Sequence, residues 1–350
     1  MLPSMAIVTG AVTGTERASG TDTPSPLTWQ QAMKQAVRDP VTLCRMLELP
    51  RSYEPAAIRA AASFPVFAPR EFIGRMVRGE VHDPLLRQVL PLAEELETAE
   101  GFTADPVADH RAIVATGLLQ KYAGRVLIVS TGACAVHCRY CFRRHFPYAA
   151  EQASRSRWAA ILQHLQDDRS IDEVILSGGD PLTLSDERLS EMVDQLGRIP
   201  HLRRLRVHTR LPIVIPQRVT DELIRLLRSG PLAPIVVVHA NHPQELDASV
   251  LAAFGRLVDA GIPLLNQAVL LRGVNDAVEP LEALSRRLVD HRVMPYYLHQ
   301  LDRVAGAQHF ETPAELGPQL IEQLRARLPG YAVPRLVREI PGELAKTALA

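Results

Sequence analysis

Three of the chain's four cysteines lie within eight residues, in the segment Cys134-Ala-Val-His-Cys138-Arg-Tyr-Cys141. Cysteine thiolates are the usual ligands of iron–sulfur clusters, and a 4Fe–4S cluster needs four ligands. A C-x3-C-x2-C loop supplies three, so one iron remains open to a group that does not come from the protein. The spacing therefore predicts a 4Fe–4S cluster held by Cys134, Cys138 and Cys141.

A zinc site is the alternative reading of the same loop, with His137 or His145 as the fourth ligand. Zinc sites usually combine two separated pairs of ligands, and this sequence offers no second pair. The spacing favours the cluster and leaves zinc open. The fourth cysteine, Cys44, lies in a helical pattern and is predicted to be a buried thiol without chemistry.

The elements that would position this loop follow a regular alternation. Short β-branched runs occur at 126–130, 173–177, 205–209, 235–239, 264–271 and 293–299. Helical patterns separate or follow them at 156–167, 185–197, 219–229, 245–260, 278–291 and 315–328. Strands that alternate with helices predict a parallel sheet with helical crossovers.

The spacing of these units indicates a barrel. Six units between residues 126 and 300 occupy 175 residues (300 − 126 + 1), about 29 each, close to the roughly 30 residues of a βα unit. Two more units would need roughly 60 residues, and 50 remain (350 − 300). We therefore predict an α/β fold, a partial six-unit (β/α) barrel. An open doubly wound sheet is the alternative.

The chain divides into four predicted segments. Residues 1–26 are small, polar and turn-rich, and they predict disorder, with Met5 as a possible true start. Residues 27–123 predict a helical N-terminal layer, broken by prolines. Residues 124–312 form the predicted barrel core, and 313–350 a C-terminal helix with a terminal lysine segment.

Polar residues gather where the predicted strands end, as expected for the active edge of such a barrel. The cysteine loop follows the first strand, Gly178-Gly179-Asp180 the second, and His208-Thr-Arg210 ends the third. His239, Gln267 and Asp302 accompany the fourth, fifth and sixth strands. One large site at one rim is predicted.

Charge and hydropathy exclude several functions. Lys+Arg and Asp+Glu both number 39, so the clustered basic excess of a nucleic-acid-binding protein is not seen. No apolar run approaches the roughly 18–20 residues of a membrane span, and no secretion signal is recognisable at the N-terminus. Three clustered cysteines suit a reducing compartment, and we expect a cytoplasmic protein.

Longer segments identify a family. The resemblance to lysine 2,3-aminomutases, which are radical S-adenosylmethionine (SAM) enzymes, is carried by Cys141-Phe-Arg-Arg144, His208–Arg218, His239–Pro243, Asn266–Asp276 and Pro295–Tyr297. It extends from about residue 64 to residue 346. Within the family, the length and the N-terminal segment look most like members that make β-lysine for elongation factor P.

The resemblance implies a SAM site beside the cluster. SAM would bind the open iron, and Gly178, Gly179 and Asp180 resemble the turn that holds the methionine amino group. Further SAM-pocket positions implied by the resemblance are His239, Gln267 and Asn275.

The resemblance also implies pyridoxal 5′-phosphate (PLP) and a lysine substrate. Lys346 matches the lysine that holds PLP, with Tyr122 and Arg125 nearby. Arg143 matches the partner of the substrate α-carboxylate, which suits a guanidinium. Asp302 and Glu339 match the two carboxylates that receive the ε-ammonium, and Glu339 stands where free-lysine mutases have an aspartate.

The expected reaction is the conversion of L-lysine to (R)-β-lysine. A separate ligase would then load the product onto elongation factor P, and flavodoxin or ferredoxin would supply electrons. The alternatives are a mutase of free lysine or of glutamate in metabolism, although two carboxylates would repel the glutamate side chain. A non-catalytic iron–sulfur or zinc protein is the more distant alternative.

Overall fold

The computed structural model describes residues 27–350, so the predicted disorder of residues 1–26 lies outside the described part. One sheet of ten strands, in the order β1 to β10, runs through the molecule. Its strands are β1 Ile113–Ala115, β2 Leu118–Tyr122, β3 Arg125–Thr131, β4 Glu173–Gly178, β5 Arg204–Thr209, β6 Ala233–Val238, β7 Leu264–Val269, β8 Met294–His299, β9 Arg335–Arg338 and β10 Thr347–Ala348. Strands β3 to β9 are successively parallel.

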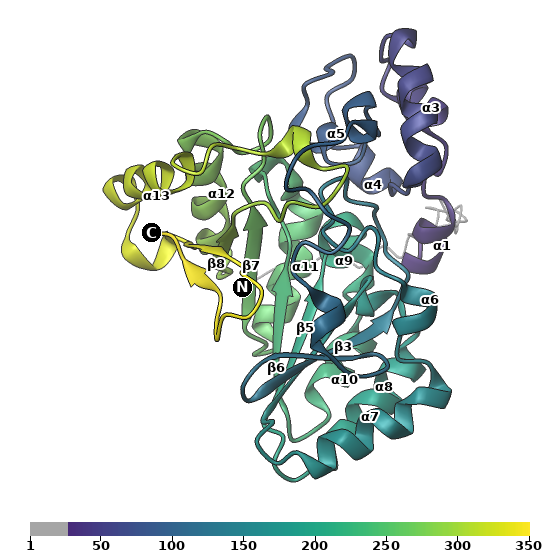
Figure 1. Cartoon of the computed structure of the whole chain (residues 1–350), viewed down its shortest axis with the longest axis vertical. Helices are drawn as coiled ribbons and strands as arrows, with labels where there is room; N and C mark the ends of the chain where they lie inside the picture. The colour runs from purple at the N-terminus through teal and green to yellow at the C-terminus, as the bar shows by residue number, and fades with distance from the viewer. Residues whose placement is uncertain (1–26) are drawn as a thin grey trace, which may run out of the picture.

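Helices cross over between these parallel strands and cover the outside of the sheet (Figure 1). The crossover helices are α6 Tyr148–Glu151, α7 Arg155–Asp167, α8 Asp186–Gly197, α9 Leu211–Val214, α10 Asp221–Arg228, α11 Ala248–Asp259, α12 Val278–Asp290 and α13 Leu316–Arg327. All six predicted strands and six predicted helices are confirmed, with ends that differ by at most three residues. The partial (β/α) barrel is therefore confirmed.

The amphipathic pattern explains why these helices pack on the sheet. In α8 the buried residues Leu189, Met192, Val193 and Leu196 recur at helical spacing, and Ser185 caps the N-terminus by accepting from the backbone N–H of Arg188. The strands carry β-branched residues that are buried, as in Val236 to Val238 of β6. These apolar side chains pack the helices onto the outer side of the sheet.

The N-terminal layer contains five short helices that lie together at one end of the molecule (Figure 1). They are α1 Trp29–Lys34, α2 Pro40–Met46, α3 Glu54–Ser63, α4 Arg70–Ile73 and α5 Pro84–Arg87. Cys44 is buried in α2, as predicted. None of the described helices is long and apolar enough to span a membrane.

Two predictions about the edges of the sheet were wrong. Residues 113–122 form β1 and β2 rather than a helix, because Ala123 and Gly124, the latter with φ +77°, turn the chain so that β2 pairs antiparallel with β3. A seventh parallel strand, β9, follows α13 where only a helix and a lysine segment were expected. No β1–β10 pairing occurs within residues 27–350, so the described barrel is open.

Candidate active site

A cavity of about 390 Å³ opens at the carboxyl ends of the parallel strands, within the size range of small-molecule sites. It brings together residues that are up to 282 positions apart in the chain (346 − 64). The sequence-predicted residues that line it are Tyr122, Arg125, Cys134, Cys138, Cys141, Arg143, Gly178, Gly179, Asp180, His239, Gln267, Asp302, Glu339 and Lys346. The predicted single site at one rim is confirmed as an arrangement in space.

The cysteine loop directly follows β3 and presents its three thiols to this cavity. Burial raises the pKa of the Cys141 thiol to about 11, and burial with the other two cysteines raises the pKa of Cys134 well above its usual value. Bound iron would deprotonate such thiols, because metal coordination stabilises the thiolate directly. The donor set and the buried setting therefore fit an iron–sulfur cluster.

Both histidines of the zinc alternative are held by the backbone. His137 Nδ1 lies 2.8 Å from the carbonyl oxygen of Pro65, and its ring stacks on Phe64. His145 Nε2 lies 3.0 Å from the carbonyl oxygen of Ala305. These contacts attach the loop to the N-terminal layer and to the segment after β8.

The Gly178-Gly179-Asp180 turn leaves β4 beside the cysteine loop. Gly178 has φ +111°, which favours glycine, and an added Cβ at Gly179 would come within 2.8 Å of the carbonyl carbon of Ala133. Glycine at this position is therefore what lets the turn lie against the start of the cysteine loop.

We expect Gly179→Ala to disrupt SAM binding. The added methyl group must displace Ala133, next to Cys134, at a cost of about 1–3 kcal/mol. SAM affinity for the reconstituted protein, measured by equilibrium dialysis, should fall by about fivefold or more, because 1.4 kcal/mol corresponds to a factor of ten. Gly255→Ala in α11 is the matched control, because nothing lies within 4 Å of its added Cβ. Equal SAM affinities for the two variants would contradict the expectation.

Asp180 is buried, and the protein uses both of its carboxylate oxygens. Oδ1 accepts from the backbone N–H of Leu182 at 3.0 Å and the hydroxyl of Thr209 at 2.7 Å. Oδ2 accepts from the backbone N–H groups of Arg210 and Leu211 at 2.7 and 3.0 Å. The carboxylate thus joins the turn after β4 to the end of β5, and its contact with a methionine amino group stays a prediction.

A chain of alternating charges crosses the other side of the cavity. Arg143 Nε donates to Asp109 Oδ2 at 2.6 Å, and Lys121 Nζ lies 2.7 Å from Asp109 Oδ1. Lys121 also donates to Glu339 Oε1 at 2.6 Å, and Lys346 donates to Glu339 Oε2. The three cations and two carboxylates orient one another, which fixes the Arg143 guanidinium in the cavity.

The sheet explains why residues remote in sequence meet here. Asp302 follows β8 and Glu339 follows β9, and these strands are parallel neighbours, so both residues lie at the same edge. Strand β10 returns antiparallel to β9 with Thr347 opposite Arg338. Lys346, one residue earlier, therefore lies opposite Glu339.

The two carboxylates differ in ionisation. Burial and the neighbouring Glu339 raise the pKa of Asp302 to about 7. Burial also disfavours ionisation of Glu339, but Lys346 and Lys121 outweigh it and lower the pKa of Glu339 to about 2. Glu339 is therefore ionised at neutral pH, whereas Asp302 is close to half ionised.

Four further residues with predicted cofactor roles line the cavity between the cysteine loop and the charged residues. His239 contacts the Gln267 amide, and burial, with nearby Arg210, lowers the pKa of His239 to about 3. Tyr122 and Arg125 lie together, with the guanidinium 4.6 Å from the ring centroid. All four residues line the cavity, and their cofactor roles stay predictions.

Asn275 is the predicted site residue that does not line the cavity. Its side chain is fully buried and bonded to the backbone, accepting from Leu271 N–H and donating to the carbonyls of Asn241 and Val269. The predicted placement in the SAM pocket is wrong, because the amide instead fixes the loop that follows β7.

Lys121 and Asp109 are cavity-side residues that the sequence reasoning missed. Lys121 lies in β2, in a segment for which a helix was predicted, so its position relative to Glu339 could not be seen. One feature of the sequence could have indicated Lys121. It directly precedes Tyr122, which the family resemblance had already placed near the PLP.

Comparisons with known proteins agree with this geometry. Residues 128–284 match the radical SAM superfamily. The chain is 45% identical to "L-lysine 2,3-aminomutase" of Escherichia coli strain K12, over 94% of this chain and 96% of that protein. It is 43% identical to the protein of the same name from Haemophilus influenzae, over 92% and 95%, and 34% identical to that of Clostridium subterminale, over 91% and 77%. The chain therefore belongs to the L-lysine 2,3-aminomutase family of radical SAM enzymes, and it is an isomerase of the aminomutase type.

Proposed function

We propose that this enzyme converts L-lysine to (R)-β-lysine with a 4Fe–4S cluster, SAM and PLP. Membership of the radical SAM superfamily implies the cluster and SAM. The observation that carries the proposal is the composition of the cavity at the carboxyl ends of the strands. Three cysteines line it together with a buried arginine, two carboxylates and a lysine.

The lysine content supports Lys346 as the PLP residue. The sequence contains three lysines, Lys34, Lys121 and Lys346, and Lys34 is exposed on α1. Lys121 Nζ donates to Glu339 and to the carbonyl of Val107 and forms an ion pair with Asp109, so oxygen atoms of three residues surround its ammonium. Lys346 has Glu339 as its one hydrogen-bond partner among residues 27–350. Its amine is therefore the more available nucleophile.

The protein's own residues would orient the substrate between the two cofactors. When bound, cluster and SAM supply a carbon-centred radical that removes a hydrogen atom, and PLP supplies a π-system for the migrating nitrogen. Arg143, oriented by Asp109, offers its Nη groups to the α-carboxylate. Asp302 and Glu339, both in the lining of the cavity, would receive the ε-ammonium. Once Lys346 holds PLP, it no longer brings an ammonium to Glu339, and the substrate ammonium can replace it.

Substrate affinity should depend on pH through Asp302. With a pKa of about 7, this carboxyl is about one-tenth ionised at pH 6 and about nine-tenths ionised at pH 8. Binding an ammonium requires the ionised form, so KM for lysine should fall about tenfold as pH rises from 6 to 8. Initial rates against lysine concentration across this range would measure it.

Asp302→Asn is the matched variant, because the amide keeps the size of the side chain and removes its titration. It should have a raised KM at pH 8 and a flat KM profile between pH 6 and 8. If KM of Asp302→Asn still fell with rising pH as in wild type, Asp302 would not be the group that binds the substrate ammonium.

The proposal extends to the fate of the product. We infer that β-lysine is passed in the cytoplasm to a ligase that loads elongation factor P, with flavodoxin or ferredoxin as electron donor. What supports this is the length and the N-terminal segment of the chain, which resemble those of family members that make β-lysine for elongation factor P. A mutase of free lysine for metabolism is the second candidate, and the name L-lysine 2,3-aminomutase that the relatives carry is compatible with it.

An anaerobic assay with reconstituted cluster, SAM, PLP, dithionite and amino acid would test the proposal. Chiral mass spectrometry should detect (R)-β-lysine from L-lysine. Parallel reactions with L-glutamate and with lysyl-modified elongation factor P separate the candidates. If SAM is cleaved but no β-lysine forms, the radical chemistry is supported and free L-lysine is rejected as the substrate.

A further inference from the structure

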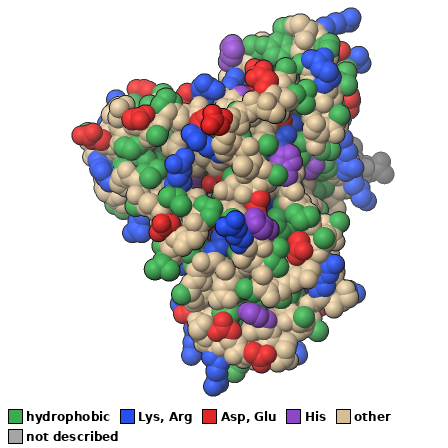
Figure 2. All heavy atoms as spheres, in the orientation of Figure 1, with side chains coloured by type: hydrophobic (Ala, Val, Ile, Leu, Met, Phe, Trp, Pro, Cys, Tyr) green, Lys and Arg blue, Asp and Glu red, His purple; other side chains and the backbone are tan. Residues whose placement is uncertain are grey.

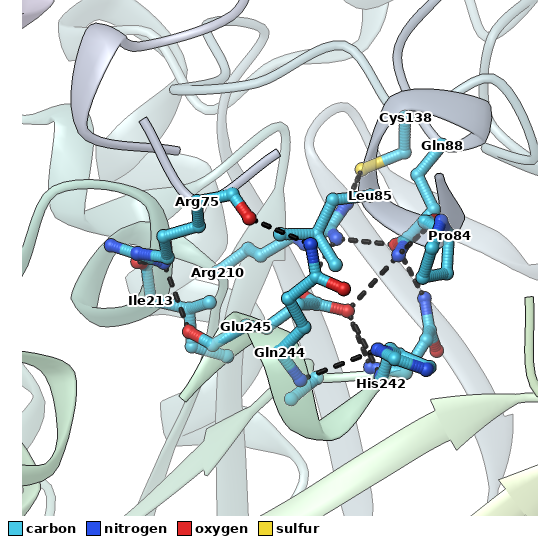
Figure 3. A network of polar contacts seen from close by, with 12 residues as sticks. Arg75, Pro84, Leu85, Gln88, Cys138, Arg210, Ile213, His242, Gln244 and Glu245 are labelled. Carbon is cyan, nitrogen blue, oxygen red and sulfur yellow. Dashed lines mark hydrogen bonds and ion pairs between the residues drawn. The ribbon is translucent and has the colours of Figure 1, made fainter. Parts of the chain in front are cut away.

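We propose that Arg210 is a positioning residue that raises the reduction potential of the cluster, and that Glu245 moderates the effect. The proposal rests on the cluster at the cysteine loop. Arg210 directly follows β5, and its Nη1 donates to the sulfur of Cys138 at 2.8 Å (Figure 3). Among residues 27–350, it is the only guanidinium with a hydrogen bond to a cysteine sulfur.

The guanidinium is held firmly in this position. Its Nη2 donates to Gln88 Oε1 at 2.5 Å and to Glu245 Oε2 at 2.9 Å. It lies over the rings of Phe72 and Tyr140, 5.3 and 5.7 Å from their centroids. A buried cation with partners on both Nη atoms and an aromatic ring on two sides has little freedom to turn away from the sulfur.

Glu245 is fixed by the backbone as well as by Arg210. Its side chain is completely buried, and Oε1 accepts from the backbone N–H groups of Asn241 and His242 at 2.8 and 3.1 Å. Gln88 Nε2 donates to the same oxygen at 3.1 Å. Figure 3 shows Gln88, the residue after α5, and His242, in the loop after β6, both contacting the carboxylate. The Glu245–Arg210 pair is therefore built into the fold.

Arg210 also touches the predicted SAM turn through its main chain. Its backbone N–H donates to Asp180 at 2.7 Å, while its side chain reaches Cys138. One residue thus connects the glycine-rich turn after β4 with a cluster cysteine. A change in the position of Arg210 would therefore alter the contacts of both the turn and the cysteine.

Elementary electrostatics gives the sign of the effect. Reduction adds an electron to the cluster, so a nearby positive charge and an N–H···S hydrogen bond favour the reduced state. The sulfur contacts Nη1, whereas Glu245 contacts Nη2, so the cation is nearer to the cluster than its counter-ion. The carboxylate cancels only part of the positive field. Removing the cation and removing the carboxylate should therefore shift the potential in opposite directions.

Two substitutions by glutamine test this. In Arg210→Gln the cation and the N–H···S bond from the guanidinium are lost, and in Glu245→Gln the carboxylate charge is lost but an acceptor remains. Redox titration of the reconstituted proteins, followed by electron paramagnetic resonance, would give the potentials. At the wild-type midpoint, the reduced-to-oxidised ratio should fall about tenfold in Arg210→Gln, which is 59 mV for one electron. It should rise in Glu245→Gln.

The controls separate tuning from loosened packing. Arg75→Gln removes another buried cation that supports the same loop, donating to the carbonyl of Glu245 at 2.9 Å, but touches no cysteine. Its potential should match wild type, and Arg210→Lys should shift less than Arg210→Gln because the charge remains. Shifts of the same sign in Arg210→Gln and Glu245→Gln, or shifts no larger than in Arg75→Gln, would overturn the proposal. If Arg210→Gln fails to fold, the reduction potentials of Glu245→Gln and Arg210→Lys still test the proposal. A wild-type protein without a cluster would instead refute the proposed function.

Discussion

Replacing Cys138 with alanine is expected to abolish β-lysine formation. The variant keeps two of the three thiols that line the cavity, and two ligands leave a second iron of the cluster without a protein partner. It also removes the sulfur that accepts from Arg210. Iron and sulfide content after anaerobic reconstitution should fall well below wild type, and turnover should drop by at least about a thousandfold.

Cys44→Ala is the matched control, because this cysteine is buried in α2 within the N-terminal layer and does not line the cavity. It should keep the iron content, the cluster spectrum and the activity of wild type, with at most a modest loss of thermal stability. Full iron content in Cys138→Ala, or loss of iron in Cys44→Ala, would show that the three-cysteine loop is not the cluster site.

The sequence was most informative where the pattern is local. Most parallel strands of the core are short apolar runs between amphipathic helices. Polar residues at the strand ends meet at one edge because parallel strands share that edge. The short outer strands escaped prediction. Strand β9 has four residues and β10 has two, too few for a period to be recognised.

Pairings across the cavity could not be read from the sequence. No spacing links Lys121 with Asp109 and Glu339, which come from β2, the segment before β1 and the end of β9. The four hydrogen bonds to Asp180 and the contact of Arg210 with Cys138 likewise depend on the conformations of the loops, which the sequence pattern does not give. Balanced charge was visible in composition, and Figure 2 shows acidic and basic side chains interspersed on the face toward the viewer.

Lys346→Ala is expected to prevent covalent attachment of PLP and to stop turnover by at least about a thousandfold, since a required group is lost. The iron content should remain that of wild type, because Lys346 precedes β10 whereas the cysteine loop follows β3. The variant therefore separates the PLP role from the cluster role. Trapping the bound PLP with borohydride, followed by digestion and peptide mass spectrometry, would measure attachment.

Only three peptides can carry the trapped label, because the chain has three lysines. Wild type should be labelled at Lys346, and Lys121→Gln should keep that label, because Asp109, Glu339 and Val107 occupy the Lys121 ammonium and leave Lys346 as the reactive amine. In Lys121→Gln, Glu339 also loses one of its two cationic partners. Glu339 should therefore bind the substrate ammonium more tightly than in wild type, as long as Arg143 stays paired with Asp109. A label at Lys121 in wild type would transfer the PLP assignment to that residue and make Lys346 a counter-ion of Glu339.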